Sequence, residues 1–130
     1  MTPQTSRTVF TVAALFNWVV AAALFFTPHL FQQLFQISPP VDQLLWVQLF
    51  AGLVFVFGIG YFWASRDLQA NRNIVKLGVI GKWAVVVIGL WNVVVGQVSW
   101  QFMIPASADG IFAILFTIAL SGHSQTQRPA

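Results

Sequence analysis

The chain has 130 residues, of which 58% are hydrophobic and only 7% carry a charge. Soluble domains carry about 25% charged residues, so this composition excludes a water-covered surface and predicts that most of the chain faces lipid. The absence of cysteine excludes disulfides, iron–sulfur clusters and thiolate chemistry. We interpret the net charge of +3 as a topology signal and expect no nucleic-acid partner.

Four apolar stretches are each long enough, at about 20 residues, to cross a bilayer as a helix. They run over residues 9–27, 44–64, 74–96 and 106–122, between a tail at 1–8 and a tail at 123–130. The run LFAGLVFVFGIGYFWA has no polar face, which argues against a soluble bundle, and no segment alternates as a barrel strand does. The sequence therefore predicts an all-α fold, a four-transmembrane-helix bundle.

A short amphipathic segment, TPHLFQQLFQISPP, follows the first span. Thr27 and Pro28 are typical of a helix start, and Pro39–Pro40 of a stop. Apolar side chains and glutamines fall on opposite faces, so we predict a short interfacial helix. A connector that caps the bundle is favoured over a membrane-active helix, because such helices are usually cationic.

The basic residues predict the orientation. One side of the four spans holds Arg7, Arg66, Arg72, Lys76 and Arg128, and the loops at 28–43 and 97–105 hold no Lys or Arg. Basic loops stay in the cytoplasm, so we expect a multi-pass protein of the bacterial inner membrane with both termini cytoplasmic. Arg66, Arg72 and Lys76 are candidates for binding lipid headgroups, with simple topology determinants as the alternative.

Polar residues inside the spans are functional candidates because they are costly in lipid. Counted along their spans, Asn17 and Lys82 both lie about 12 Å from the cytoplasmic surface and are predicted to share a layer. This candidate intramembrane polar site would bind an anionic headgroup or a quinone oxygen, or relay protons. The alternative is that the Lys82 side chain snorkels to the interface.

A second group of polar residues belongs to the opposite half of the spans. Gln48, Asn92, Asp109 and His29, with Asp42 nearby, are predicted to line an outward-facing polar pocket. By the same count Asp109 and Lys82 differ in depth by over about 10 Å, so we do not expect them to be partners. The alternative role for Asp109 is a first-turn carboxylate favoured by the helix dipole.

No motif in the chain points to catalysis or to a metal. There is no HExxH sequence and no metal-ligand set, and GVIGKW lacks the spacing of a phosphate loop. We therefore predict no catalytic residues and no metal, and leave a quinone as the one cofactor to consider.

One further pattern combines four segments of the chain. They are PHLFQQLFQISPP, the glycine-rich second span, the motif NRNIVKLGVIGKW and the aspartate of ADGIFAILF. In this layout the chain resembles the small four-span bacterial membrane proteins grouped as DoxX-like, over most of residues 10–120, although the first span lacks the arginine and glycine typical of that group. The family includes a quinone-linked oxidoreductase subunit, so the resemblance directs attention to Lys82 and Asp109.

Three functions are compatible with these features. The first is a non-catalytic subunit or scaffold that binds lipids and partner proteins, as a homo-oligomer or within a larger membrane complex. The second is a quinone- or lipid-binding subunit of a membrane oxidoreductase, suggested by aromatic spans around Lys82. The third is an oligomeric transporter or channel for small solutes, suggested by the outer polar set.

Overall fold

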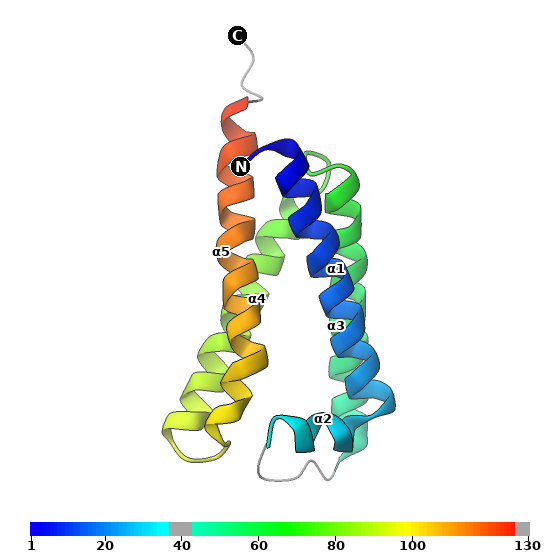
Figure 1. Cartoon of the computed structure of the whole chain (residues 1–130), viewed down its shortest axis with the longest axis vertical. Helices are drawn as coiled ribbons and strands as arrows, with labels where there is room; N and C mark the ends of the chain where they lie inside the picture. Colours follow the sequence, from blue (N-terminus) through cyan, green and yellow to red (C-terminus); the bar gives the residue numbers. More distant parts are fainter. Residues whose placement is uncertain (37–42, 127–130) are drawn as a thin grey trace.

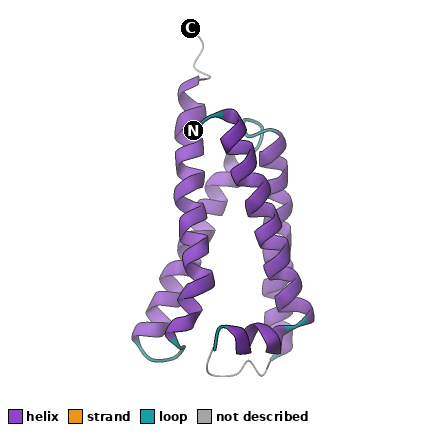
Figure 2. Cartoon of the chain, in the orientation of Figure 1, coloured by secondary structure: helices purple, strands orange, loops and turns teal. Residues whose placement is uncertain are grey.

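The computed structural model describes residues 1–36 and 43–126, and these residues form an all-α fold with no strand. Its helices are α1 (Pro3–Phe26), α2 (Pro28–Leu34), α3 (Leu44–Arg66), α4 (Arg72–Val94), the 3₁₀ turn η1 (Trp100–Phe102) and α5 (Met103–Thr126). Figure 2 shows that nearly all of the described chain is helical. The predicted helix stop at Pro39–Pro40 and the polar residue Asp42 lie outside the described residues.

Within the described part of the chain, four helices are long and apolar enough to cross a membrane: α1, α3, α4 and the segment formed by η1 and α5. The chain is thus a small multi-pass membrane protein, as its composition predicts. The helices extend beyond the predicted apolar stretches because polar residues continue them at several ends. α1 begins at Pro3, where Thr2 caps it by accepting a hydrogen bond from the Thr5 amide, and α5 continues to Thr126.

The four long helices form two antiparallel pairs, α1 with α3 and α4 with α5 (Figure 1). The pairs approach each other at the end that holds the N-terminus and the α3–α4 turn, which we call the terminal end. They separate toward the opposite end, which we call the α2 end because α2 lies there between them. The bundle is therefore wedge-shaped, and this shape positions the site described below.

The predicted interfacial helix is present as α2, which is shorter than expected. Thr27 ends α1 by donating its hydroxyl to the Ala23 carbonyl, and Pro28 then starts α2 in a new direction. α2 ends at Leu34, and Gln36 adopts a positive φ of 50°. Leu30 and Leu34 are largely exposed, which places apolar side chains on the outside of the bundle.

The core lies at the terminal end and combines small residues with three aromatic rings. The Phe10 ring stacks on Phe116 at 4.7 Å between centroids, and Tyr61 packs against Phe116 at 4.9 Å. All three residues are fully or almost fully buried. Around them α1, α3 and α5 present alanines that let the helices approach closely: Ala13, Ala14, Ala64 and Ala119.

Two glycines make room for large side chains in this packing. A Cβ at Gly58 would lie 2.6 Å from the Trp18 indole nitrogen, and a Cβ at Gly78 would lie 2.7 Å from the Tyr61 ring. These contacts fix Trp18 against α3 and Tyr61 against α4. The Tyr61 side chain thus packs against α4 at Gly78 and against α5 at Phe116.

Candidate functional site

A buried ion pair between α4 and α5 forms the centre of the candidate site. The Lys82 ammonium lies 2.6 Å from Oδ1 of Asp109, and the two side chains are 5% and 20% exposed. This contact corrects the prediction that the two residues are too far apart in depth to be partners. It also replaces the snorkelling alternative for Lys82, whose ammonium is directed into the bundle.

The prediction was wrong because it started the last helix at Ala106. α5 begins at Met103 and is preceded by η1, so Asp109 lies about 9 Å along α5 at 1.5 Å per residue. α4 ends at Val94, which places Lys82 about 18 Å from the same end of the bundle. The long stem of the lysine side chain spans this remaining difference.

Asn17 joins this ion pair to the other helix pair. Its amide nitrogen donates to the Val54 carbonyl at 3.0 Å, and its Oδ1 accepts a long hydrogen bond of 3.4 Å from Lys82. The expected layer of Asn17 and Lys82 is therefore confirmed as a geometry. A continuous set of hydrogen bonds now links all four long helices, from Val54 on α3 through Asn17 on α1 and Lys82 on α4 to Asp109 on α5.

Aromatic rings surround the Lys82 ammonium on the sides that these polar atoms leave open. The nitrogen lies 5.3 Å from the Tyr61 ring centroid, 5.4 Å from Phe112 and 5.8 Å from Phe16. Ring faces attract a cation at such distances. The rings compensate part of the hydration that the ammonium gives up on burial.

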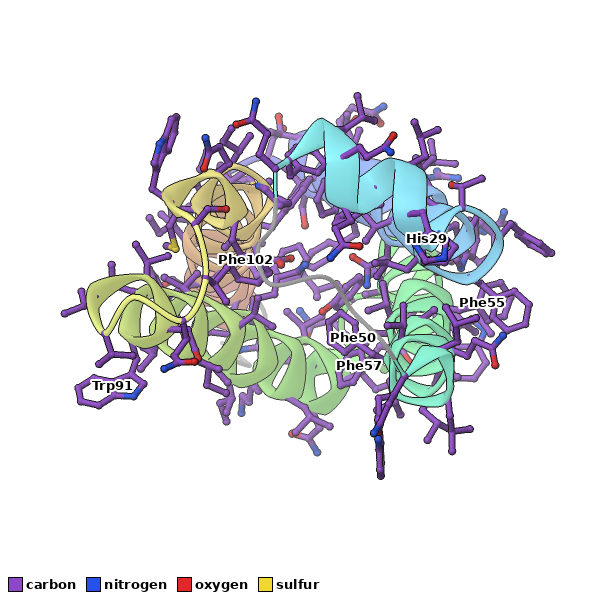
Figure 3. The ribbon with its side chains drawn as sticks, turned by 90° about the horizontal axis from the view of Figure 1, so that it is seen from below. His29, Phe50, Phe55, Phe57, Trp91 and Phe102 are labelled. Carbon is purple, nitrogen blue, oxygen red and sulfur yellow. The ribbon has the colours of Figure 1, made fainter. Side chains whose placement is uncertain are left out.

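A cavity of about 490 Å³ opens between the two helix pairs, from the ion pair to the α2 end. Asn17, Tyr61, Lys82 and Asp109 form its inner end, which we call the floor. Its walls are almost entirely apolar, and six aromatic residues line them: Phe16, Phe31, Trp46, Phe50, Phe57 and Phe102. Figure 3, seen from the α2 end, shows Phe50, Phe57 and Phe102 around the enclosed space, with Trp91 and Phe55 turned outward.

A smaller hollow of about 220 Å³ lies between α3 and α4 and shares three lining residues with the cavity: Phe50, Val85 and Phe102. Its other lining residues include Ile88, which is 62% exposed on the outer surface of α4. A side chain at position 89 would collide with the Phe102 ring. Because Gly89 has none, the Phe102 ring can lie between the cavity and the smaller hollow.

The structure does not assemble the predicted outer polar pocket. Asp109 turns to Lys82 at the floor, and Asn92 donates to the Ile88 carbonyl of its own helix and lines the smaller hollow. Gln48 and His29 are exposed and line neither space. Asp109 thus belongs with Asn17 and Lys82 and not with the outer set.

The three basic residues on either side of the α3–α4 turn have different surroundings. Arg72 donates to the Leu120 carbonyl at 3.1 Å and so holds α4 to α5. The Arg66 guanidinium lies 5.9 Å from the Phe62 ring, and Lys76 is exposed. Binding of lipid headgroups by this group stays a prediction, with Arg66 and Lys76 as its accessible members.

Within residues 1–36 and 43–126, no group of three or more histidine, cysteine or acidic side chains could hold a metal ion. Protein-family models, curated proteins and solved structures give no match to this chain. The resemblance to DoxX-like proteins accordingly stays a prediction.

Sequence reasoning noted aromatic spans around Lys82 but did not single out Tyr61. The chain has a single tyrosine and 13 phenylalanines, and this tyrosine, Tyr61, lies five residues before the C-terminal end of α3. Tyrosine buried in a membrane core usually has a specific contact for its hydroxyl end. That signal would have placed Tyr61 beside Lys82 as a candidate.

Proposed function

We propose that this protein binds an amphipathic small molecule taken from the bilayer, with its apolar body in the cavity and its polar end at the Lys82–Asp109 pair. The observation that carries the proposal is the cavity itself, about 490 Å³ with apolar walls and a charged floor. Small-molecule sites are typically concave spaces of about 300–1,000 Å³, mostly apolar, with a few convergent polar groups.

The charges at the floor support a role in binding. An ion pair in a membrane interior is costly, and apolar residues of similar volume often stabilise a fold as well or better. Helix packing alone does not call for Lys82 and Asp109, because Asn17 and the close contacts of Gly58 and Gly78 already join the helices. A polar floor facing an apolar cavity gives a ligand an orientation.

The smaller hollow supports entry from the lipid phase. It lies between α3 and α4, reaches the exposed residue Ile88, and is separated from the cavity by Phe50, Val85 and Phe102. A ligand dissolved in the bilayer would pass between these two helices after rotation of one or more of the three side chains. Such a route requires no passage through water.

A quinone or a lipid fits this description, and in either case the chain would be the ligand-binding subunit of a membrane complex. We place the protein in the bacterial inner membrane with its termini in the cytoplasm, so that the cavity opens toward the outer leaflet. Binding is favoured over passage of solutes because the fully buried stack of Phe10 and Phe116 lies beyond the floor at the terminal end.

The test is a pair of neighbouring variants on α1. Val20 lines the cavity, and Val19 is 68% exposed on the outer face of the same helix. Val20→Trp fills the cavity, whereas Val19→Trp adds the same side chain to the lipid-facing surface. Each protein is extracted with its surrounding lipid, without detergent, and its bound molecules are identified by native mass spectrometry.

Wild type and Val19→Trp should retain one discrete molecule per chain, enriched over bulk lipid, and Val20→Trp should lose it. Recovery of bulk lipid alone with all three proteins, or equal retention by Val20→Trp, would contradict the proposed function.

A further inference from the structure

The floor of the cavity presents its polar atoms unequally. Asp109 is 20% exposed at its side chain and Lys82 only 5%. Lys82 uses Oδ1 of Asp109 and Oδ1 of Asn17, and rings cover its remaining sides. The Asn17 amide is committed to Val54 and Lys82. Tyr61, the fourth residue of the floor, is only 2% exposed, so the accessible polar group of the floor is the Asp109 carboxylate.

The second carboxylate oxygen of Asp109 is the atom that remains for a ligand. Among the described residues, Lys82 is the one hydrogen-bond donor to Asp109, and it reaches Oδ1 alone. A carboxylate has about four lone-pair sites on its two oxygens and can accept further hydrogen bonds. This oxygen accepts and does not donate, so it selects a ligand that carries a donor.

The charges at the floor disfavour ionic ligands. The pair sums to zero charge, so the floor carries no net charge that would draw an ion into the cavity. A cation bound to Asp109 would lie close to the Lys82 ammonium, because that ammonium is 2.6 Å from the same carboxylate. An anion would meet the exposed carboxylate before it reached the covered ammonium. Like charges at such distances in a low-dielectric site repel strongly.

Building on the proposed function, we infer that the ligand is an uncharged, hydroxyl-bearing apolar molecule whose hydroxyl donates to the free oxygen of Asp109. An O–H donor to a carboxylate forms a charge-assisted hydrogen bond, which is stronger than one between neutral groups. The six aromatic residues of the walls suit a body that contains a ring, and alkylphenols and ring-bearing lipid alcohols belong to this class. A quinone meets the requirement for a donor only in its reduced, hydroquinone form.

Four probes with the same apolar body test this inference. para-Nonylphenol carries the hydroxyl, and para-nonylanisole replaces its hydrogen by a methyl group and cannot donate. para-Nonylbenzoate is the anion, and para-nonylphenyltrimethylammonium is the cation. Binding of each radiolabelled probe to the full chain in lipid nanodiscs is measured by equilibrium dialysis, with empty nanodiscs and Val20→Trp nanodiscs as background.

We expect saturable binding of para-nonylphenol at least about tenfold tighter than that of the other three probes, since a hydrogen bond to a charged group is worth a factor of about ten or more. In the double variant Lys82→Gln/Asp109→Asn, which keeps the side-chain volumes and removes both charges, the preference should fall to about threefold or less. Thermal unfolding of this variant in the same nanodiscs checks that it is folded.

The other outcomes separate the two proposals. If phenol and anisole bind equally and Val20→Trp blocks both, the cavity binds ligands and the hydroxyl inference is overturned. Tightest binding of the ammonium or the benzoate overturns it as well. If no probe binds above the level of Val20→Trp nanodiscs, the proposed function fails and this inference fails with it. An unchanged preference in the double variant shows that Asp109 is not the acceptor.

Discussion

Replacement of Asp109 by leucine is expected to destabilise the protein strongly, because it leaves the Lys82 ammonium buried without a carboxylate. At the observed separation of 2.6 Å and an effective dielectric constant of about 20, the attraction between the two charges is about 6 kcal/mol. Burial of the two ions offsets much of this attraction in the wild type. Asp109→Leu forfeits the attraction while the burial of Lys82 remains, so the free energy of unfolding should fall by about 3–5 kcal/mol.

Three further variants determine whether the charges are the cause. Asp109→Asn keeps an oxygen that accepts from Lys82, and its cost should be smaller, about 1–3 kcal/mol. The double variant Lys82→Met/Asp109→Leu removes both ions and should lie within about 1 kcal/mol of wild type. Lys76→Met removes an exposed lysine from the same helix and should have little effect.

The assay is reversible unfolding in mixed micelles with increasing SDS, followed by far-ultraviolet circular dichroism. The double-mutant cycle gives the coupling between the two side chains directly. A loss of stability for Asp109→Leu no greater than that for Lys76→Met would show that the buried ion pair does not stabilise the fold. So would a double variant whose loss equals the sum of the two single losses, because the ions would then act independently.

Three other predictions follow from the packing. Gly58→Ala should lower the free energy of unfolding by about 1–3 kcal/mol because its Cβ would press on Trp18. Gly52→Ala on the same helix meets nothing within 4 Å and should be neutral or stabilising. Unfolding in mixed micelles measures both variants, and equal effects would contradict the packing of Trp18 against Gly58. Gly89→Ala should displace Phe102 and thereby change the rate at which a probe enters the nanodisc-bound protein, by about threefold or more relative to Gly52→Ala. Stopped-flow fluorescence measures this rate, and identical rates for the two variants would argue against a route between α3 and α4. The native chain has no cysteine, so single introduced cysteines can report the orientation of the spans. Gln97→Cys should react with an impermeant maleimide in intact cells, and Ala70→Cys should react only after permeabilisation. The reverse pattern would contradict the proposed cytoplasmic placement of the termini.

The sequence predicted the helices well because the bilayer imposes their length and composition. A run such as LFAGLVFVFGIGYFWA allows few alternatives in lipid, and α3 follows it closely. Helix ends were less predictable, since caps such as Thr2 extend α1 into residues that carry polar side chains. Counting residues along the spans also sufficed to place Asn17 and Lys82 in one layer.

The same count failed for Asp109, because an error of one helical turn at the start of α5 moves a residue by about 5 Å. Rotation of a helix about its axis is likewise absent from a count along the chain. The cage of Tyr61 and Phe112 around Lys82 depends on that rotation, and so does the turn of Asn92 toward its own helix. The cavity depends on how two helix pairs diverge, which no single span contains.

A crystal structure grown in a lipidic mesophase containing lipids from the native membrane would show whether the cavity holds a ligand at Asp109. We expect the Lys82–Asp109 contact at the floor and one bound molecule between the helix pairs, with a polar atom within hydrogen-bond distance of Asp109. Helix pairs closed against each other, with side chains filling the space between Phe50, Phe57 and Phe102, would contradict this expectation.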